Sequence, residues 1–301
     1  MKKYSGIDEL PFGQAEGDII KGCLVLEGGA FRGLYTGGVL DALMVHGIQL
    51  ECVAGVSAGA LNGYNYISGQ IGRASRFNLG HRHDPDYVGL PAFRRNHGLF
   101  GFDIVFDDER NGEPLNKEKF MDPGRRFIAV ATDCRTGKPV YFENGKCGDI
   151  FAAIQASASM PVISKMVEAD GIPCLDGGCS VAIPLDFAIG EGYEKIIVVK
   201  TRDDLYRKNV KTGSFDKLKK LLYRKYPELL KALFSSASRY NELCERIQKL
   251  RAEGRIYVIS PSSPVTVSRL ERDMEKLGAL YHQGYNDTVG QLEKIREYLA
   301  G

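Results

Sequence analysis

Apolar residues in the first part of the chain form short continuous runs that alternate with stretches of helical spacing. The run GCLVL at 22–26 is followed by apolar residues at helical spacing over 34–44. The run ECVA at 51–54 leads into a helix of small residues that reaches about Ile67. This order of strand, helix, strand and helix with short connections predicts a parallel sheet with helices on its faces.

The same patterns predict further elements along the chain. Strands are expected at Phe127–Ala131, Pro139–Phe142, Ile196–Lys200 and Ile256–Ile259, and helices at about 148–158, 214–252 and 268–299. Residues 70–124 are polar and rich in turn residues, which predicts an insertion over one end of the sheet. Because no internal repeat or flexible linker interrupts the pattern, we expect a single large domain over residues 1–301.

Composition and charge narrow the class of protein. A hydrophobic fraction of 44% and a charged fraction of 26% exclude a mostly disordered chain. The net charge of +2 gives no reason to expect a nucleic-acid partner. The first twenty residues lack the apolar region of a signal peptide, and no apolar run approaches the roughly 18 residues of a membrane span. We therefore expect a cytoplasmic protein.

One segment has a strong charge surplus. Residues 201–255 carry 15 Lys and Arg against 7 Asp and Glu. Within this segment, residues 214–234 interleave apolar and basic side chains, which suits a helix that contacts an anionic membrane or covers an acyl pocket. The alternative is a helix that packs on the sheet and exposes a solvated basic face. Pro227 is expected to break or start a helix there.

The seven cysteines give no sign of a metal site or of disulfides. They form no C-x-x-C pair, and their number is odd, so we expect reduced thiols and no metal. Cys23 and Cys52 lie in apolar runs and are expected to be small core residues.

The sharpest chemical motif is Gly55-Val56-Ser57-Ala58-Gly59, which lies between a predicted strand and a predicted helix. A serine nucleophile in such a turn occupies strained backbone, and Gly55 and Gly59 let the chain pass without a clash. The following helix directs its free N–H groups at the turn. The pattern alone is expected by chance about 0.2 times in a chain of this composition, so its strand–turn–helix context carries the argument.

Two other glycine motifs accompany it. Gly28-Gly29-Ala30-Phe31-Arg32-Gly33 joins a strand to a helix and can present several N–H donors to an anion, either a phosphate or the oxyanion of an ester under attack. Asp176-Gly177-Gly178 follows a short apolar stretch, and its aspartate could accept the proton of a serine hydroxyl.

Together, GGAFRG, GVSAG and DGG in this order resemble the patatin-like phospholipases. The segment AAIQASASMP at 152–161 and the last long helix with Gly284 also look like bacterial members, so the resemblance spans roughly residues 20–300. It implies a three-layer α/β/α sandwich on a mostly parallel sheet, a lipid acyl hydrolase that works through a Ser–Asp dyad, and no cofactor.

The resemblance also assigns roles to residues. Ser57 would be the nucleophile and Asp176 the proton acceptor that later protonates the leaving alcohol. The amides of the 28–31 loop would form the oxyanion hole, with Arg32 fixing that loop or facing the substrate. The third position of this loop, often glycine in the family, is Ala30, which puts its fine geometry in doubt. The expected partner is a phospholipid or another acyl ester.

Three alternatives remain open. An α/β-hydrolase triad could use Ser57, Asp176 and His282, although His282 lies within a run of helical periodicity. A dinucleotide-binding protein could use the first glycine loop with Glu51, but it would leave the other two motifs unexplained. A non-catalytic protein of the same fold could simply bind lipid.

Overall fold

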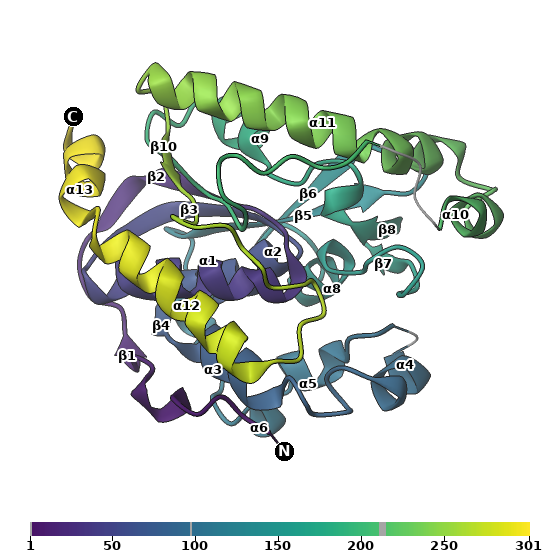
Figure 1. Ribbon diagram of the computed structural model, residues 1–301, viewed down its shortest axis with the longest axis horizontal. Helices are drawn as coiled ribbons and strands as arrows, with labels where there is room; N and C mark the ends of the chain where they lie inside the picture. Colours follow the sequence, from purple (N-terminus) through teal and green to yellow (C-terminus); the bar gives the residue numbers. More distant parts are fainter. Residues whose placement is uncertain (1, 97, 211–214) are drawn as a thin grey trace.

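The computed structural model of the chain describes residues 2–96, 98–210 and 215–301 and has a central mixed sheet between two layers of helices (Figure 1). The strands of this sheet lie in the order β10-β9-β2-β3-β5-β8-β7, and β6 also pairs with β5. The five strands from β10 to β5 are parallel to one another. Strands β6 and β8 each run antiparallel to β5, and β7 runs antiparallel to β8. The predicted mostly parallel three-layer sandwich is therefore confirmed.

The element bounds are as follows. The strands are β1 (Gly13–Gln14), β2 (Ile19–Leu26), β3 (Gln49–Val56), β4 (Gln70–Ile71), β5 (Arg126–Asp133), β6 (Pro139–Glu143), β7 (Val167–Ala169), β8 (Ile172–Asp176), β9 (Ile196–Val199) and β10 (Tyr257–Ile259). The helices are α1 (Gly33–Val45), α2 (Ala58–Ile67), α3 (Arg73–His81), α4 (Leu90–Asn96), α5 (Phe102–Phe106), α6 (Asp108–Asn111), α7 (Lys117–Phe120), α8 (Ile150–Ser157), α9 (Leu185–Gly190), α10 (Asp216–Leu222), α11 (Pro227–Ala252), α12 (Met274–Val289) and α13 (Leu292–Ala300). Short 3₁₀ turns cover Ile7–Glu9, Ala30–Arg32 and Gly177–Cys179.

The core lies on both faces of the sheet because successive side chains of a strand point to opposite sides. On one face, the strands pack against α9 and α11, which cross the upper part of Figure 1. On the other face, they pack against α1, α2, α8 and α12. Cys23 and Cys52 are buried neighbours on adjacent strands, as predicted, and all seven cysteines are free thiols.

The predicted strands and helices all occur, with two adjustments. The helix expected at 214–252 is divided into α10 and α11, because Pro227 takes the first position of α11, where its missing N–H costs no hydrogen bond. Residue 214 of that prediction lies outside the described residues. The helix expected at 268–299 begins only at Met274 and is likewise divided, into α12 and α13.

Residues 70–124 contain five short helices that the sequence patterns did not predict. Each spans fewer than three turns, so apolar periodicity is too brief to detect. This segment also buries more apolar area than its polar composition suggests, through Phe77, Tyr87, Phe100 and Phe102. That it is an insertion into the fold stays a prediction.

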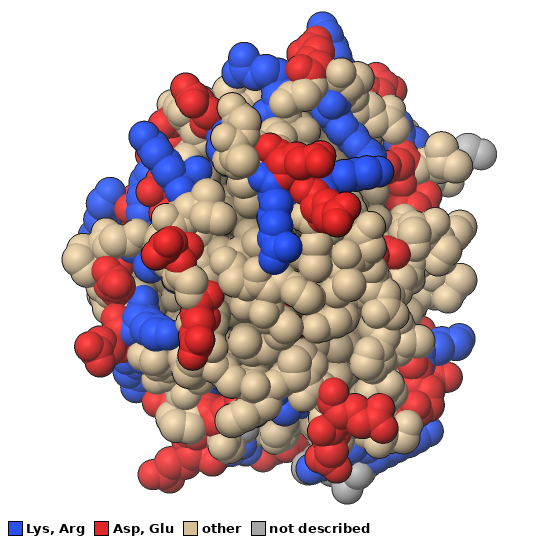
Figure 2. All heavy atoms as spheres, turned by 90° about the vertical axis from the view of Figure 1, so that its left-hand side faces the viewer, with Lys and Arg blue, Asp and Glu red and all other residues tan. Residues whose placement is uncertain are grey.

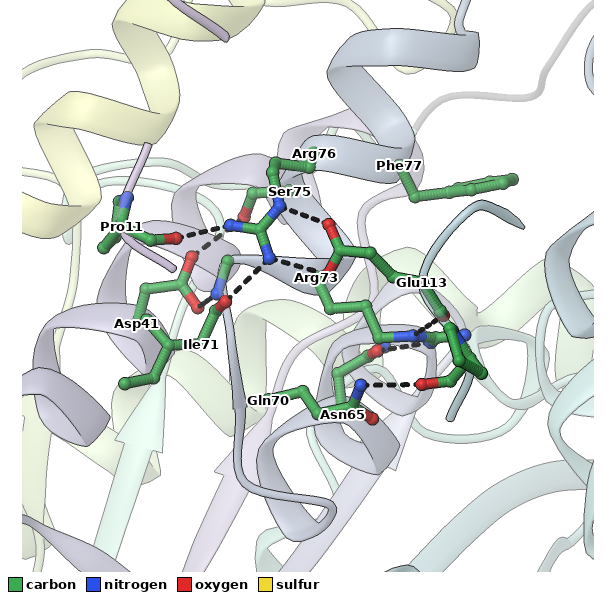
Figure 3. Close-up of polar contacts among 12 residues, drawn as sticks. Pro11, Asp41, Asn65, Gln70, Ile71, Arg73, Ser75, Arg76, Phe77 and Glu113 are labelled. Carbon is green, nitrogen blue, oxygen red and sulfur yellow. Dashed lines mark hydrogen bonds and ion pairs between the residues drawn. The ribbon is translucent and has the colours of Figure 1, made fainter. Parts of the chain in front are cut away.

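A network of buried and partly buried polar groups joins this segment to α1 and α2 (Figure 3). Arg73 on α3 donates to Asn65 of α2 at 2.7 Å and to the carbonyl of Glu113 at 2.7 Å. Arg76 forms an ion pair with the carboxylate of Glu113. Asp41 on α1 accepts the N–H of Gly72 at 2.8 Å. Because these buried groups find partners on separate elements, the network fixes how α3 lies against α1 and α2.

Helices α1 and α12 approach each other closely at two glycines. A Cβ on Gly38 would lie 2.1 Å from the carbonyl oxygen of Tyr281, and one on Gly284 would lie 2.1 Å from that of Tyr35. Neither backbone can move aside cheaply, since α1 is enclosed between the sheet and α12.

We expect Gly284→Ala to lower the free energy of unfolding by at least about 2 kcal/mol, because the methyl group would force the two helix backbones apart. Urea unfolding followed by circular dichroism measures this difference. Gly190→Ala is the control, since no atom lies within 4 Å of its new Cβ, and its effect should stay within about 0.5 kcal/mol. Equal midpoints for the two variants would contradict the prediction.

Candidate active site

Strand β5 brings the predicted nucleophile and the predicted base together. Val56, the last residue of β3, pairs with Val130, and Asp176, the last residue of β8, pairs with Ala131. Strand β6 occupies the opposite edge of β5 along 128–132, so β3 and β8 share one edge. They run in opposite directions and meet end to end. Ser57 and Asp176 therefore face each other although 118 positions of sequence separate them.

Ser57 is buried at the sharp turn between β3 and α2, with φ of 55° and ψ of −119°. This left-handed region is unfavourable for a residue with a side chain, so the surrounding contacts must hold it there. Its N–H donates to the hydroxyl of Ser157 at 2.8 Å, and that hydroxyl donates to the carbonyl of Val130 at 2.6 Å. Ser157 thus fastens the turn to β5.

Gly55 and Gly59 are required by close packing of the turn. A Cβ on Gly55 would lie 2.5 Å from the carbonyl carbon of Gly59, and one on Gly59 would lie 2.5 Å from the carbonyl oxygen of Leu26. Gly177 is restricted in the same way, because a Cβ there would lie 2.2 Å from the carbonyl oxygen of Val130. These glycines let α2 and the end of β8 press against the sheet beside Ser57.

The side chain of Asp176 is buried and lies near the hydroxyl of Ser57. Its carboxylate also accepts the N–H of Gly178 at 2.7 Å. Burial raises the pKa of Asp176 above its ordinary value, because the charged form loses hydration. The neighbouring hydroxyl of Ser57, the N–H of Gly178 and the positive charges of Arg269 and Lys208 oppose this rise.

The loop at 28–33 lies beside Ser57, but not all its amides are free. The N–H of Gly28 donates to Ala182 at 3.2 Å, and that of Phe31 donates to the carbonyl of Arg269 at 3.3 Å. Among the described residues, no acceptor is recorded for the N–H groups of Gly29 and Ala30. Ala30 has φ of 50°, so the alanine that departs from the family pattern occupies backbone that favours glycine.

Two cavities meet at Ser57. A narrow cavity of about 40 Å³ is lined mainly by apolar side chains, among them Phe31, Leu61 and Phe102. A larger cavity of about 320 Å³ contains the carboxyl of Asp176 and is lined by the cations Arg32, Lys208, Lys219 and Arg269. Gly29 contributes to the larger cavity, whereas Ala30 lines both. An ester placed at Ser57 would thus have apolar surroundings on one side and charged surroundings on the other.

The remaining predicted positions fall as follows. Arg32 is buried and lines the larger cavity, as does Gly178. Gly33 begins α1, and a Cβ added there would lie 2.7 Å from the Cβ of Ala58. His282 lines neither cavity; it lies on α12 with its ring against Tyr4 and Tyr281.

Three residues of the site were missed by sequence reasoning. Ser157 lies in the AAIQASASMP segment, where nothing distinguishes it from its serine neighbour at 159. Lys208 and Arg269 reach the cavity from segments far along the chain, and neither lies in a motif that marks a site.

Comparison with known proteins identifies the family. A family described as "Patatin-like phospholipase" matches residues 24–189, which is more than half of the chain. The chain belongs to the patatin-like phospholipase family. A second family, described as a domain of unknown function (DUF6363), matches residues 226–300, which include α11, α12 and α13.

Individual relatives of this patatin-like chain are distant. It is 28% identical to the uncharacterized protein YjjU of Escherichia coli over 89% of this chain and 78% of that protein. It is 27% identical to "Probable lipid hydrolase 463L" of invertebrate iridescent virus 6 over 71% of this chain and 81% of the viral protein. An uncharacterized NTE family protein of Mycobacterium tuberculosis shares 28% identity over 58% of this chain but 48% of its own length. Among solved structures, VipD from Legionella pneumophila has the same fold with a TM-score of 0.50, 14% identity, and coverage of 98% of this chain and 71% of VipD.

The described residues provide two further findings. No group of three or more His, Cys, Asp or Glu side chains among them is placed to hold a metal ion. None of their helices is both long and apolar enough to cross a bilayer.

The raised pKa of Asp176 predicts a pH-dependent stability difference between the wild type and Asp176→Asn. As the pH rises above the pKa of the Asp176 carboxyl in the unfolded chain, the unfolded state loses this proton before the folded state does. The folded wild type therefore loses stability until the pH passes the pKa of this carboxyl in the folded state. Asparagine does not titrate. The variant should therefore gain stability relative to wild type as pH rises from about 4 and then level off.

Urea unfolding at a series of pH values measures this difference. Asp18→Asn removes one charge from an exposed position and is the control for the general effect of net charge. A difference for Asp176→Asn that falls with pH, or that follows the control, would contradict the raised pKa.

Proposed function

We propose that this chain hydrolyses acyl esters of lipids through a covalent acyl-enzyme on Ser57, with Asp176 as the general base. The observation that carries the proposal is that Ser57 and Asp176 lie buried at the meeting ends of β3 and β8, where an apolar and a cationic cavity adjoin. Membership in the patatin-like phospholipase family and the similarity to a probable lipid hydrolase support it.

In the first half of the reaction, Ser57 Oγ attacks the acyl carbonyl carbon while its proton passes to Asp176. The carbonyl oxygen becomes an oxyanion, for which the N–H groups of Gly29 and Ala30 are the available donors in the loop. The ester C–O bond then breaks, and the leaving alcohol takes the proton from Asp176. In the second half, water attacks the acyl-enzyme, Asp176 accepts its proton, and the fatty acid is released as Ser57 regains its hydroxyl.

The local structure suits each group to its part. The left-handed backbone of Ser57 lifts its hydroxyl out of the strand, and the N-terminus of α2 places positive partial charge behind it. The raised pKa of Asp176 makes its carboxylate a stronger base than an exposed aspartate, while the nearby cations help keep it ionised.

We expect Ser57→Ala and Asp176→Asn each to lower kcat/KM for a medium-chain p-nitrophenyl ester at least about 1,000-fold. His282→Ala should leave it within about twofold, because His282 lines neither cavity. Release of p-nitrophenol measures all three, and circular dichroism verifies that the variants are folded.

Other outcomes would redirect the proposal. Loss of activity in His282→Ala would favour a Ser–Asp–His triad. Turnover that survives Ser57→Ala would exclude Ser57 as the nucleophile. A wild type inactive towards this ester and towards a panel of phospholipids would favour a lipid-binding role without catalysis.

The proposal has a second part, which is a membrane contact within residues 201–255. We assign this contact to helix α10 alone. Helix α11 buries its apolar stripe against the sheet, through Leu229, Tyr240 and Ile247. Helix α10 has no buried residue; Leu221 and Leu222 are 63% and 50% exposed.

Basic residues surround this exposed face of α10. Lys217, Lys220 and Arg224 are exposed beside it, and Lys219 lines the larger cavity. Apolar side chains flanked by cations suit the interface of an anionic bilayer, and here they lie at the rim of the proposed active site.

We expect the protein to sediment with vesicles that contain phosphatidylglycerol better than with pure phosphatidylcholine vesicles. Leu221→Ser combined with Leu222→Ser should weaken this binding at least about tenfold, because burial of a leucine contributes about 1.5–3 kcal/mol. The control is Leu205→Ser. Leu205 belongs to the same basic segment and is 88% exposed, but it lies away from α10. Equal binding to both kinds of vesicle, or equal loss in the control, would contradict the contact.

A further inference from the structure

The larger cavity at Ser57 has an unbalanced charge. Four cationic side chains line it, and Asp176 is the sole carboxylate among the described lining residues. The chain as a whole has a net charge of only +2, and the face drawn in Figure 2 shows both signs interspersed around an area without charged residues. The surplus in the cavity is therefore a local feature that needs its own explanation.

Lys219 is already partnered, because it forms an ion pair with Asp216 at 3.3 Å. The other three cations form no ion pair with any described carboxylate. Arg32 is only 7% exposed, and its buried Nε has no hydrogen-bond partner among the described residues. A buried cation with an unsatisfied donor is costly unless an anion completes it.

Lys208 is held in place through its backbone. Its N–H donates to the side chain of Asn241 at 2.8 Å, and its carbonyl accepts from the same side chain at 3.0 Å. Its ammonium lies 4.2 Å from the centre of the Tyr240 ring. Burial, together with the charges of Arg269 and Arg32, lowers the pKa of Lys208 to about 8, although Glu27 opposes the shift. Binding of an anion would relieve this unfavourable environment.

Arg269 lies at the exposed side of the cavity, on the segment between β10 and α12. Its carbonyl accepts the N–H of Phe31 at 3.3 Å. This bond fastens the Arg269 segment to the loop that carries Arg32, so both guanidinium groups border one space.

Taking this cavity as part of the proposed lipid hydrolase, we propose that it selects acyl lipids whose headgroup is a phosphate monoester, with Lys208 and Arg269 as specificity-determining residues. The cavity lining has three unpaired cations against one carboxylate, that of Asp176, and this excess of positive charge suits a phosphate monoester of about −1.5 to −2. A choline or ethanolamine headgroup would add a cation to this cavity. The apolar cavity on the other side of Ser57 would receive the start of the acyl chain.

Both specificity residues lie outside residues 24–189, the part of the chain that matches the patatin-like family. The selectivity thus depends in part on residues beyond that match, and the charges of the same two residues also act on Asp176.

The test compares three lipids with one acyl chain in neutral detergent micelles: lysophosphatidic acid, lysophosphatidylcholine and monoacylglycerol. For the wild type, we expect kcat/KM for lysophosphatidic acid to exceed that for either other lipid at least about tenfold. Lys208→Gln and Arg269→Gln should each reduce this preference at least about fivefold, mainly through KM. Lys208→Arg and Arg269→Lys should retain most of it, because they keep the charge.

The controls are Lys249→Gln on α11 and Arg272→Gln three residues beyond Arg269, both at exposed positions that do not line the cavity. They should keep the wild-type preference. Equal loss in the controls would indicate a general charge effect and would overturn the proposal.

The remaining outcomes separate this proposal from the proposed function. Hydrolysis of monoacylglycerol that depends on Ser57, without any preference for lysophosphatidic acid, would leave the hydrolase in place and overturn the headgroup selectivity. Inhibition of that hydrolysis by inorganic phosphate, together with equal rates on the three lipids, would indicate a site for a free anion and would also overturn it. Hydrolysis that survives Ser57→Ala would instead refute the proposed function.

Discussion

The arrangement of the site depends on one edge of strand β5, which two strands share end to end. Strand β3 pairs with its first part and β8 with its last residues, and the two approach from opposite directions. Hydrogen bonds to a common strand fix both ends at once, so the position of Ser57 relative to Asp176 does not depend on a loop. The close packing at Gly55, Gly59 and Gly177 is the steric condition for this junction.

In this arrangement, the positioning of Ser57 and Asp176 and the binding of a substrate depend on different elements of the fold. The sheet and its glycines position Ser57 and Asp176, the groups proposed to react, whereas the surroundings that would recognise a substrate come from other elements. Side chains of the 70–124 segment line the apolar side, and Lys208 and Arg269 line the cationic side. Changes in these outer segments can therefore alter what fits beside Ser57 without disturbing the register of β5.

Much of the fold could be predicted from the sequence because its signals are local. Strand–turn–helix patterns and three glycine motifs lie in continuous stretches, and the fold and the family they indicated were confirmed. The same reasoning could not find Ser157, which acts through a contact with a residue 100 positions away, nor the five short helices of 70–124. Sequence reasoning also treated the amides of 28–31 as equivalent. The N–H groups of Gly28 and Phe31 donate to carbonyls at 182 and 269, and such distant acceptors cannot be seen in the local sequence. Contacts between distant parts of the chain leave no local pattern.

The close approach of α1 and α12 at Gly38 and Gly284 has a consequence for how the chain can be divided. Sequence families separate a patatin-like part that ends at 189 from a region that begins at 226. In space, however, α12 of the second region is seated on α1 of the first, backbone against backbone. A fragment that ended between the two families would leave a row of apolar side chains on α1 open to water. The boundary between the two families is thus no place to cut the protein or to graft a foreign domain, and the two regions are constrained to change together.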